Sequence, residues 1–373
     1  MKPLIIDIEG AGREVGRQHA QGAIGLREEV AAWVGSAVEA HPLSSATVRG
    51  RLDEVVRSWE QLTPATLDQV AGMAEVYDLS VDDLLVAVLG TYLRSRDRAH
   101  GPAEGCTTFA TTGESPLLVK NRDNDGAYLH LQTVLRVRPP QGHPWLALST
   151  AGAPGVHSSG MNDVGLCVVD THVPSSDVGP GVPRFSSMMH LLEQCSTTGE
   201  AVDYLLATPQ MGLGNLTLLD AQGAAAVVEC GYNSTVVAMA TGGPDESPTG
   251  GPDESPAGGV LATNHHITPV LAGCLLEPPE GTPAANSRAR RDVVETFLTC
   301  PGATTDLAAV KELVASHVGD DGTGNAPGSV CQHGPDLKSE TIATTIYDPV
   351  GRHLDLCLGR PCTDPYVRIA VTG

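Results

Sequence analysis

One cysteine of this sequence has neighbours that could make it a nucleophile. Cys106 follows Gly105 and precedes Thr107 and Thr108. A glycine before a cysteine lets the backbone adopt strained geometry without a Cβ clash, and its carbonyl is open to attack by the adjacent thiol. The chain has nine cysteines, an odd number with no Cys-x-x-Cys pair, and most are expected to be small core residues. The context of Cys106 must therefore distinguish it from the others.

Other catalytic patterns have weaker support. His157-Ser158-Ser159 suggests a serine hydrolase only superficially, because the chain has no Gly-x-Ser-x-Gly elbow. The sequence also lacks the P-loop and the His-Glu-x-x-His motif, so nucleoside-triphosphate and zincin chemistry are unsupported. His265 and His266 are adjacent, and on a strand their side chains would diverge, which disfavours a shared metal. No metal or cofactor is expected.

The segment around Cys106 resembles that of the self-processing N-terminal-nucleophile hydrolases typified by the acyl-coenzyme A:6-aminopenicillanic-acid acyltransferase of penicillin biosynthesis. Gly105-Cys106-Thr107-Thr108 resembles the family's Gly-Cys-Thr-Thr, and Asn121-Arg122-Asp123 resembles its Asn-aromatic-Asp. The resemblance extends over most of the chain. Supporting segments are Gly160 to Leu166, Thr263-Asn264-His265, Asn286-Ser287-Arg288, Val330-Cys331-Gln332-His333 and Gly359-Arg360-Pro361-Cys362.

The resemblance implies that Cys106 is both nucleophile and base. Once freed, its α-amine has a reference pKa of about 8 and can accept the thiol proton directly or through water. Asn264 would supply its side-chain NH₂ to the oxyanion that develops when an amide is attacked. Asp123 would orient the new ammonium, although Asn121 to Asp125 is also polar enough to be an ordinary turn. Thr108, on the same side of a strand as Cys106, would help during cleavage.

Three further residues are implied with less definite roles. Ser287 and Arg288 match a Ser-Arg pair that orients active-site groups or binds a carboxylate-bearing substrate, but several arginines follow and leave the register open. Arg122 stands where the family has an aromatic residue, and the whole chain has 13 Phe, Tyr and Trp. A phenylacetyl-sized aromatic cage is therefore not expected. His333 lies in a Gly-rich loop and is expected to be structural.

The resemblance also implies a proenzyme that cuts itself between Gly105 and Cys106. The thiol would attack the Gly105 carbonyl, and water would release the resulting thioester. Residues 1–105 would become an α-chain, which is removed or stays associated with the catalytic β-chain, residues 106–373. Because both chains would share one core, they are expected to remain an αβ heterodimer. The implied fold is a four-layer αββα sandwich in which Cys106 begins a central strand.

The hydrophobic pattern independently predicts a mixed α+β protein. The first hundred residues read as a short strand from Leu4 to Ile8 followed by helices, one of them capped by Ser80. After Cys106 the residue pattern changes to short runs of β-branched or apolar residues separated by turn residues. These runs alternate with helices, such as the one behind the Thr197/Glu200 capping box, which suggests layers of sheet and helix.

Composition restricts the partners and the location. The 373 residues are 41 % apolar, enough for a large core, and carry a net charge of −21 without a block of Lys and Arg. Nucleic acid and anionic membranes are therefore disfavoured as partners. The first apolar run is too short and too acidic for a signal peptide, and no run of about 18 apolar residues could span a membrane. Scattered cysteines indicate free thiols in a reducing compartment, so a soluble cytoplasmic protein is expected.

Residues 241–256 form a tandem repeat, TGGPDESPTGGPDESP. Its Gly, Pro and acidic content cannot bury a core, so residues 241–259 are expected to be a disordered surface insertion. A tolerated loop expansion is preferred to a partner-binding role.

The functional hypothesis is an autoprocessed amidohydrolase or acyltransferase. It would act on a small N-acyl compound of amino-acid or natural-product type and pass an acyl group from Cys106 to water or an amine. Acyl-coenzyme A remains open as a donor. Two alternatives stay open: an uncut binding or scaffold protein that keeps the fold, and a conventional Cys-His hydrolase that depends on His333.

Overall fold

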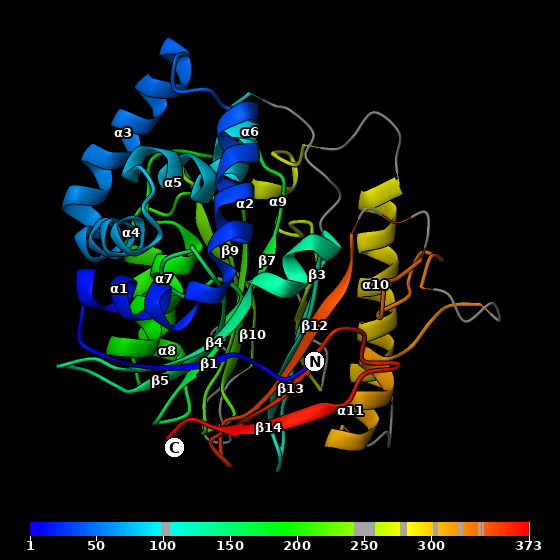
Figure 1. The fold of residues 1–373 in the computed structure, drawn as a ribbon. Helices are drawn as coiled ribbons and strands as arrows, with labels where there is room; N and C mark the ends of the chain where they lie inside the picture. The colour runs from blue at the N-terminus through cyan, green and yellow to red at the C-terminus, as the bar shows by residue number, and fades with distance from the viewer. Residues whose placement is uncertain are drawn as a thin grey trace.

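Two β-sheets form the centre of the computed structural model (Figure 1). The first has eight strands in the order β1-β4-β5-β6-β7-β8-β9-β10, all antiparallel except the parallel pair β1 and β4. Its strands are β1 (Ile5–Glu9), β4 (Gln132–Arg138), β5 (Trp145–Thr150), β6 (Ser159–Asn162), β7 (Cys167–His172), β8 (Gly214–Leu219), β9 (Ala225–Cys230) and β10 (Thr235–Thr241). The residues that the structure describes are 1–97, 105–241, 258–276, 282–300, 305–319, 324–334, 337 and 339–372.

The second sheet has six strands in the order β11-β2-β3-β12-β13-β14, and every neighbouring pair is antiparallel. Its strands are β11 (Gly259–Ala262), β2 (Thr107–Thr111), β3 (Leu117–Asn124), β12 (Glu340–Asp348), β13 (His353–Leu358) and β14 (Tyr366–Ala370). This sheet begins one residue after Cys106, so Cys106 lies at the start of an inner strand.

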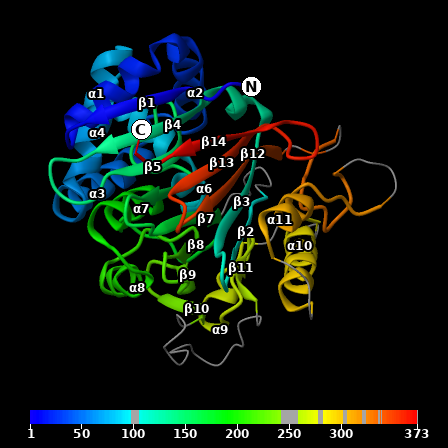
Figure 2. The same cartoon turned by 90° about the horizontal axis from the view of Figure 1, so that it is seen from below.

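Helices cover the outer face of each sheet (Figures 1 and 2). The eight-stranded sheet is covered by α1 (Arg13–Gly22), α2 (Arg27–Ala40), α3 (Ala46–Leu62), α4 (Pro64–Tyr77), α5 (Val81–Val88), α6 (Gly90–Arg96), α7 (Arg184–Gln194) and α8 (Thr198–Ala207). The six-stranded sheet is covered by α10 (Thr282–Thr299) and α11 (Leu307–Val314). Short helical turns complete the described elements: η1 (Ile24–Leu26), η2 (Gly126–Leu131) and α9 (Pro269–Ala272).

The alternation of side chains along the strands fills the spaces between these layers. On β2 and β3, Phe109 and Val119 pack against α10 and α11, whereas Ala110 and Leu118 face the other sheet. Successive strand residues point to opposite faces, so both faces of this sheet must be apolar. The helix layers, the two sheets and the three cores between them confirm the predicted four-layer αββα sandwich.

The segment before Cys106 is part of the same core. β1 is the edge strand of the eight-stranded sheet, and buried Trp59 on α3 donates a hydrogen bond of 3.0 Å to the Gly181 carbonyl. Gln69 on α4 accepts one of 2.8 Å from the backbone N–H of Gly155. Residues 1–97 therefore share one hydrophobic cluster with the chain after Cys106.

Most of the local predictions from sequence are confirmed. The expected strand at Leu4 to Ile8 is β1, Ser80 caps α5 through the N–H of Asp83, and the Thr197/Glu200 capping box begins α8. Strands β6 and β14 were missed, because each is short and only weakly alternating. The predicted disordered insertion, residues 241–259, was wrong at its ends, because Thr241 ends β10 and Gly259 begins β11 by pairing with Thr111. Residues 242–257 lie outside the described residues, so disorder there stays a prediction.

Candidate active site

Four neighbouring strands bring the predicted residues together at one edge of the six-stranded sheet. Cys106 directly precedes β2, Asp123 is near the end of β3, and Asn264 is two residues beyond the end of β11. Because β2 is antiparallel to both β3 and β11, the start of β2 meets the ends of its two neighbours. Thr341, near the start of β12, is the strand partner of Asp123.

Cys106 is buried, and its backbone is held by Asn264. The Cys106 N–H donates a hydrogen bond of 2.8 Å to the Asn264 side-chain oxygen Oδ1, and the Cys106 Sγ lies 3.8 Å from the Asp123 carbonyl oxygen. Burial raises the pKa of the Cys106 thiol; the Lys120 ammonium opposes this shift and the Asp123 carboxylate adds to it. The thiol is therefore protonated near neutral pH and needs a base before it can act as a nucleophile.

The buried Asp123 carboxylate accepts hydrogen bonds from one hydroxyl group and one side-chain amide. Its Oδ1 accepts a hydrogen bond of 2.6 Å from the Thr341 hydroxyl, and its Oδ2 accepts one of 2.5 Å from the Gln332 amide. Burial raises the pKa of Asp123 to about 6, although the Arg290 guanidinium and both hydrogen bonds oppose the shift. The carboxylate is ionised above about pH 6.

Arg290 on α10 connects these groups from the opposite side. One guanidinium nitrogen donates to the Cys106 carbonyl at 2.6 Å and to the Thr107 hydroxyl at 2.7 Å. The other donates to the Asn264 Oδ1 at 2.9 Å. Arg290 is 1 % exposed, so these are charge-assisted hydrogen bonds in a water-poor environment. Arg290 was not singled out from the sequence.

The Asn264 amide and the Thr108 hydroxyl, predicted as oxyanion donor and helper, have hydrogen-bond partners other than the Cys106 thiol. The Asn264 NH₂ donates a hydrogen bond of 2.8 Å to the His172 carbonyl, which uses one of its two hydrogens. The Thr108 hydroxyl lies 2.9 Å from the Thr217 hydroxyl of the other sheet and donates to the Ala262 carbonyl at 3.2 Å. Thr108 therefore links the two sheets behind Cys106.

The Ser-Arg pair lies on α10 but does not contact Cys106 in the described hydrogen bonds. Ser287 is buried, and its hydroxyl lies 2.8 Å from the His265 ring and 3.0 Å from the Thr263 hydroxyl. Arg288 is on the exposed side of the helix. It is Arg290, one helical turn after Ser287, that reaches Cys106. The roles predicted for Ser287 and Arg288 stay predictions.

Gly105 lies closely against the side chains of this site. A Cβ at this position would be 2.7 Å from the Gln332 Nε2 and 3.2 Å from the Asp123 Oδ2. A residue larger than glycine would have to displace the amide that holds the Asp123 carboxylate. Gly105 therefore fits the space beside Cys106 because it has no side chain.

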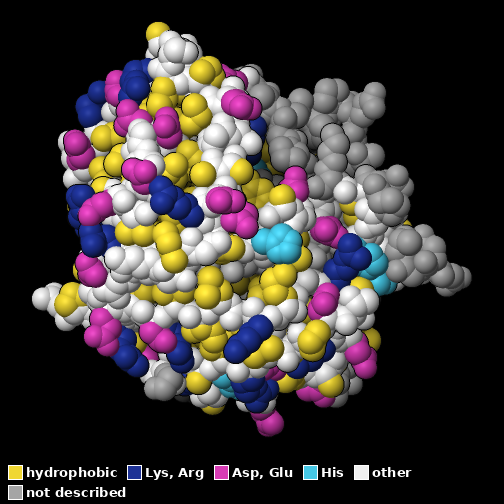
Figure 3. Space-filling model, viewed as in Figure 1, with side chains coloured by type: hydrophobic (Ala, Val, Ile, Leu, Met, Phe, Trp, Pro, Cys, Tyr) yellow, Lys and Arg dark blue, Asp and Glu magenta, His cyan; other side chains and the backbone are white. Residues whose placement is uncertain are grey.

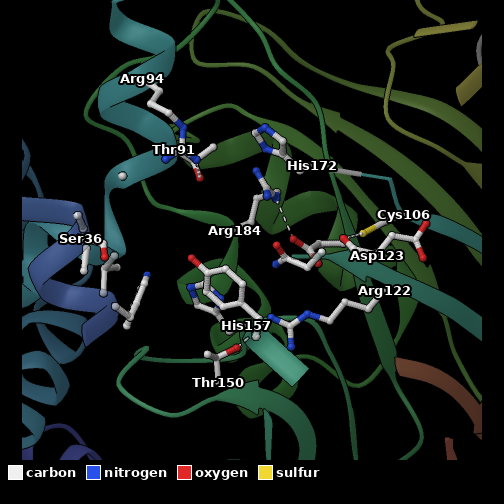
Figure 4. Close-up of a pocket in the computed structure, with 18 of the residues that line it drawn as sticks. Ser36, Thr91, Arg94, Cys106, Arg122, Asp123, Thr150, His157, His172 and Arg184 are labelled. Carbon is white, nitrogen blue, oxygen red and sulfur yellow. Dashed lines mark hydrogen bonds and ion pairs between the residues drawn. The ribbon is translucent and has the colours of Figure 1, made fainter. Parts of the chain in front are cut away.

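A cavity of about 300 Å³ opens next to Cys106 (Figure 4). Figure 4 shows Cys106 at one end and Thr91 and Arg94 at the other. Its walls come from α2, α5 and α6 before Cys106, and from β3, β5, β7 and α7 after it. The cavity is thus completed by both segments of the chain.

The cavity is lined by several cationic side chains and few acids. Arg94, Lys120, Arg122 and Arg184 line it together with two carboxylates, Asp123 and Asp170. The buried Arg122 side chain, predicted to orient or bind substrate, donates to Thr150 at 2.9 Å and to Gln132 at 3.3 Å.

Asp170 forms ion pairs with two of these cations. Its oxygens accept hydrogen bonds of 2.5 Å from Lys120 and 3.1 Å from Arg184. Burial alone would raise the pKa of Asp170, but the two cations outweigh it and hold the pKa below its usual range. The nearby His157 ring is neutral at physiological pH, because burial lowers its pKa to about 3. The lining therefore keeps an excess of positive charge.

Gln332 and Thr341 were also not predicted from the sequence as site residues. Gln332 lies inside the quoted Val330 to His333 segment but had no chemical signal of its own. Arg290 did have a signal in the sequence. Ala284, Ser287, Arg290 and Val294 are spaced as one face of a helix, and all four are buried. An arginine on the buried face of a helix indicates a specific partner.

The surface differs from this cavity. On the face seen in Figure 3, acidic and basic side chains are interspersed across the described residues. Within the described part of the chain, no helix is both long enough and apolar enough to cross a bilayer.

The αββα sandwich has the fold of the N-terminal-nucleophile hydrolases, and Cys106 precedes one of its inner strands. The chain belongs to the acyl-coenzyme A:6-aminopenicillanic acid acyl-transferase family, whose model matches residues 110–363. The predicted family and the enzyme class of amide hydrolases and acyltransferases are thereby confirmed. None of the curated proteins compared with the chain matches it.

Several solved structures are similar to the chain at low sequence identity. A variant of conjugated bile acid hydrolase from Clostridium perfringens is 15 % identical, with a TM-score of 0.44, covering 68 % of this chain and 89 % of that chain. Another mutant of that hydrolase is 14 % identical, with a TM-score of 0.45, covering 71 % and 92 %. Penicillin V acylase from Agrobacterium tumefaciens is 17 % identical, with a TM-score of 0.41, covering 72 % and 86 %.

Proposed function

We propose that this chain cuts itself between Gly105 and Cys106 and then cleaves or transfers the acyl group of a small amide through Cys106. The observation that carries the proposal is the set of polar groups around the Gly105–Cys106 bond. Asn264 accepts from the Cys106 N–H, Arg290 donates to the Cys106 carbonyl, and the Asp123 carboxylate lies beside Gly105. All three groups belong to side chains rather than to a neighbouring strand, and they converge on the one peptide bond that the proposal breaks.

The proposed cut creates the base that the buried thiol lacks. The Cys106 sulfur attacks the Gly105 carbonyl carbon, the C–N bond breaks, the thiol proton passes to the departing Cys106 nitrogen, and the acyl group moves to sulfur as a thioester. Water then hydrolyses the thioester, which leaves a Gly105 carboxylate and a free Cys106 amine. That amine can take the thiol proton. The Asn264 Oδ1 already accepts a hydrogen bond from this nitrogen, and the Asp123 carboxylate beside Gly105 is the proposed partner of the new ammonium.

In the proposed reaction the same thiol attacks a substrate amide. The carbonyl oxygen becomes an oxyanion, for which the second hydrogen of the Asn264 NH₂ is the proposed donor. The amine of the substrate leaves with the proton from the cysteine amine, and the acyl-Cys106 thioester passes to water or to an amine.

The cavity supports a small, polar N-acyl compound as the substrate. Its excess of positive charge favours a carboxylate or similar anionic group, consistent with an acylated amino acid or natural product. Trp33 and Tyr128 are among the lining residues and supply apolar surface for part of the acyl group. Acyl-coenzyme A is retained as a second class of donor to be tested.

The two products of the cut are proposed to stay together as an αβ heterodimer. The support is the single cluster of apolar side chains that combines residues before and after Cys106, and the cavity whose walls come from both segments. The α-chain would therefore form part of the substrate site.

Intact-mass spectrometry of freshly purified protein tests the cut without knowledge of any substrate. Wild-type protein is expected to give two fragments that end at Gly105 and begin at Cys106, and Cys106→Ala is expected to give one uncut chain. An uncut wild type that hydrolyses amides would contradict the mechanism. If that activity disappeared in His333→Ala, it would favour a conventional Cys-His hydrolase. A panel of N-acyl amino acids and neutral N-acyl amines, with and without acyl-coenzyme A, then tests the substrate class.

A further inference from the structure

A second cluster of reactive side chains lies outside the proposed chemistry. His317 follows α11, Cys331 and His333 lie in the segment before β12, and Cys362 follows β13. One ligand atom from each of the four residues lies within 4.8 Å of all the others. Cys331 is buried, and the other three are half-buried. Three separate segments of the chain therefore meet at this point.

Three of the six distances among the ligand atoms are close to those of a tetrahedral zinc site. The two imidazole Nε2 atoms are 3.1 Å apart, the two Sγ atoms are 3.6 Å apart, and the Cys362 Sγ is 3.4 Å from the His333 Nε2. With Zn–S bonds of about 2.3 Å and Zn–N bonds of about 2.0 Å, a tetrahedron places these pairs about 3.3, about 3.8 and about 3.5 Å apart. Each of these three distances agrees to within a few tenths of an ångström, and the other pairs lie within 4.8 Å, so binding would draw the four atoms closer together.

We propose that His317, Cys331, His333 and Cys362 together bind one zinc ion in a closed, structural site. Two cysteines and two histidines form one of the usual ligand sets for structural zinc. Binding would release the two thiol protons, and a Zn²⁺ with two thiolates and two neutral imidazoles has no net charge. Such a site can be half-buried without leaving an unpaired charge. All four positions are taken by protein, so the ion has no open position for a substrate.

Two other arrangements of the same atoms explain less of the geometry. A disulfide between Cys331 and Cys362 requires sulfur atoms about 2.0 Å apart, and it would give the two histidines no function. Separate hydrogen bonds, one between the imidazoles and one between the thiols, would not need all four atoms around one centre. Zinc explains the convergence of all four.

The zinc site would fix one residue of the proposed active site. Gln332 lies between the ligands Cys331 and His333, and its side chain donates to the Asp123 carboxylate at 2.5 Å. The Gln332 side-chain oxygen also accepts a hydrogen bond of 2.6 Å from Asn286 on α10. A metal that holds both neighbours of Gln332 would thereby hold the amide against Asp123. The zinc inference itself stands on the ligand geometry and not on the proposed reaction.

The test is the metal content of the full chain purified without chelators. Inductively coupled plasma mass spectrometry is expected to find about one zinc per wild-type chain and less than a tenth of that in Cys362→Ser and His317→Ala. Cys300→Ser is the matched control, because Cys300 is an exposed thiol away from the cluster. Circular dichroism establishes that each variant is folded before its metal is counted. Zinc retained at wild-type stoichiometry in both folded cluster variants would overturn the proposal.

Spectroscopy on the wild-type chain keeps the test independent of whether the variants fold. After exchange with Co²⁺, the protein is expected to show thiolate-to-metal charge transfer and the visible bands of tetrahedral cobalt. X-ray absorption of the zinc form is expected to fit two sulfur and two nitrogen neighbours. The proposal fails if the wild type contains no zinc and takes up neither Zn²⁺ nor Co²⁺. It also fails if the intact mass is two daltons low because Cys331 and Cys362 form a disulfide.

Discussion

At the scale of single residues, Arg290 joins three residues of the candidate site although it was not singled out from the sequence. It contacts the carbonyl of Cys106, the hydroxyl of Thr107 and the amide oxygen of Asn264. A buried guanidinium requires such partners, and those partners in turn depend on it. Replacing it therefore disturbs both the backbone at the proposed cut and the orientation of Asn264.

Arg290→Gln is predicted to slow self-cleavage at least tenfold and to lower the free energy of unfolding by about 3 kcal/mol, because it leaves buried acceptors unpaired. Arg288→Gln is the matched control, since Arg288 is exposed on the same helix, and it should change neither quantity appreciably. Both effects are measured on pulse-labelled protein, by intact mass against time and by urea unfolding. Equal effects of the two variants would contradict the role given to Arg290.

Asp123 should make the stability of the uncut chain depend on pH. Its pKa is raised to about 6, so the folded chain holds the proton more tightly than the unfolded chain does. The stabilising contribution is complete below about pH 4 and is lost as the pH rises through about 6, a change of about 3 kcal/mol for two pKa units. We predict this change in the difference between Cys106→Ala and Cys106→Ala/Asp123→Asn, measured by urea unfolding from pH 4 to pH 7.5. A difference that does not vary with pH would contradict it.

The sequence indicated the candidate residues of the site more readily than their partners. Cys106, Asp123 and Asn264 were singled out because each belongs to a short segment with a recognisable pattern, and the structure places the three close together. Gln332 and Thr341 could not be found in this way, because their position depends on strand pairing and on loops far from Asp123 in the chain. The zinc ligands were missed for the same reason, since no two of them form a Cys-x-x-Cys pair.

At the scale of elements, the backbone that leads into β2 requires glycine at position 105, because a side chain there would meet Gln332. Gly105→Ala is predicted to reduce self-cleavage at least tenfold while the protein stays folded, because the new methyl group would push Gln332 away from Asp123. Cleavage is followed by intact mass and folding by circular dichroism. Gly50→Ala on α3 is the control, since a Cβ there meets no atom within 4 Å. It should leave cleavage unchanged and add about 0.5–1 kcal/mol of stability. Normal cleavage in Gly105→Ala would contradict the steric argument.

Helices and long strands were predicted from sequence, but the order of the strands was not. Capping residues and hydrophobic period act within a few residues, so Ser80 and Thr197 marked their helices correctly. By contrast, β11 pairs with β2 although the two strands are far apart in the chain. Nothing in either segment alone indicates this partner, because pairing is decided by packing against the second sheet and α10.

At the scale of the whole molecule, the cavity beside Cys106 belongs to both segments of the chain. We predict that the cut protein elutes as one species near 38.7 kDa in size-exclusion chromatography and that both fragments are present in that peak. The reason is the shared hydrophobic cluster, which neither segment could bury alone. Separation of the fragments in native buffer would show that the segment before Cys106 is only a removable pro-segment.

Because the core is shared, the proposed cut would also change the molecularity of folding. Before the cut, β1 and helices α1–α6 are covalently tethered to the sheet that they cover, so their docking does not depend on protein concentration. After the cut the same contacts must form between two molecules, and the midpoint of thermal unfolding should rise with protein concentration. Once unfolded, the mature protein would have to find its partner by diffusion. Self-cleavage would therefore act as a one-way step, after which the fold is retained more easily than it is regained.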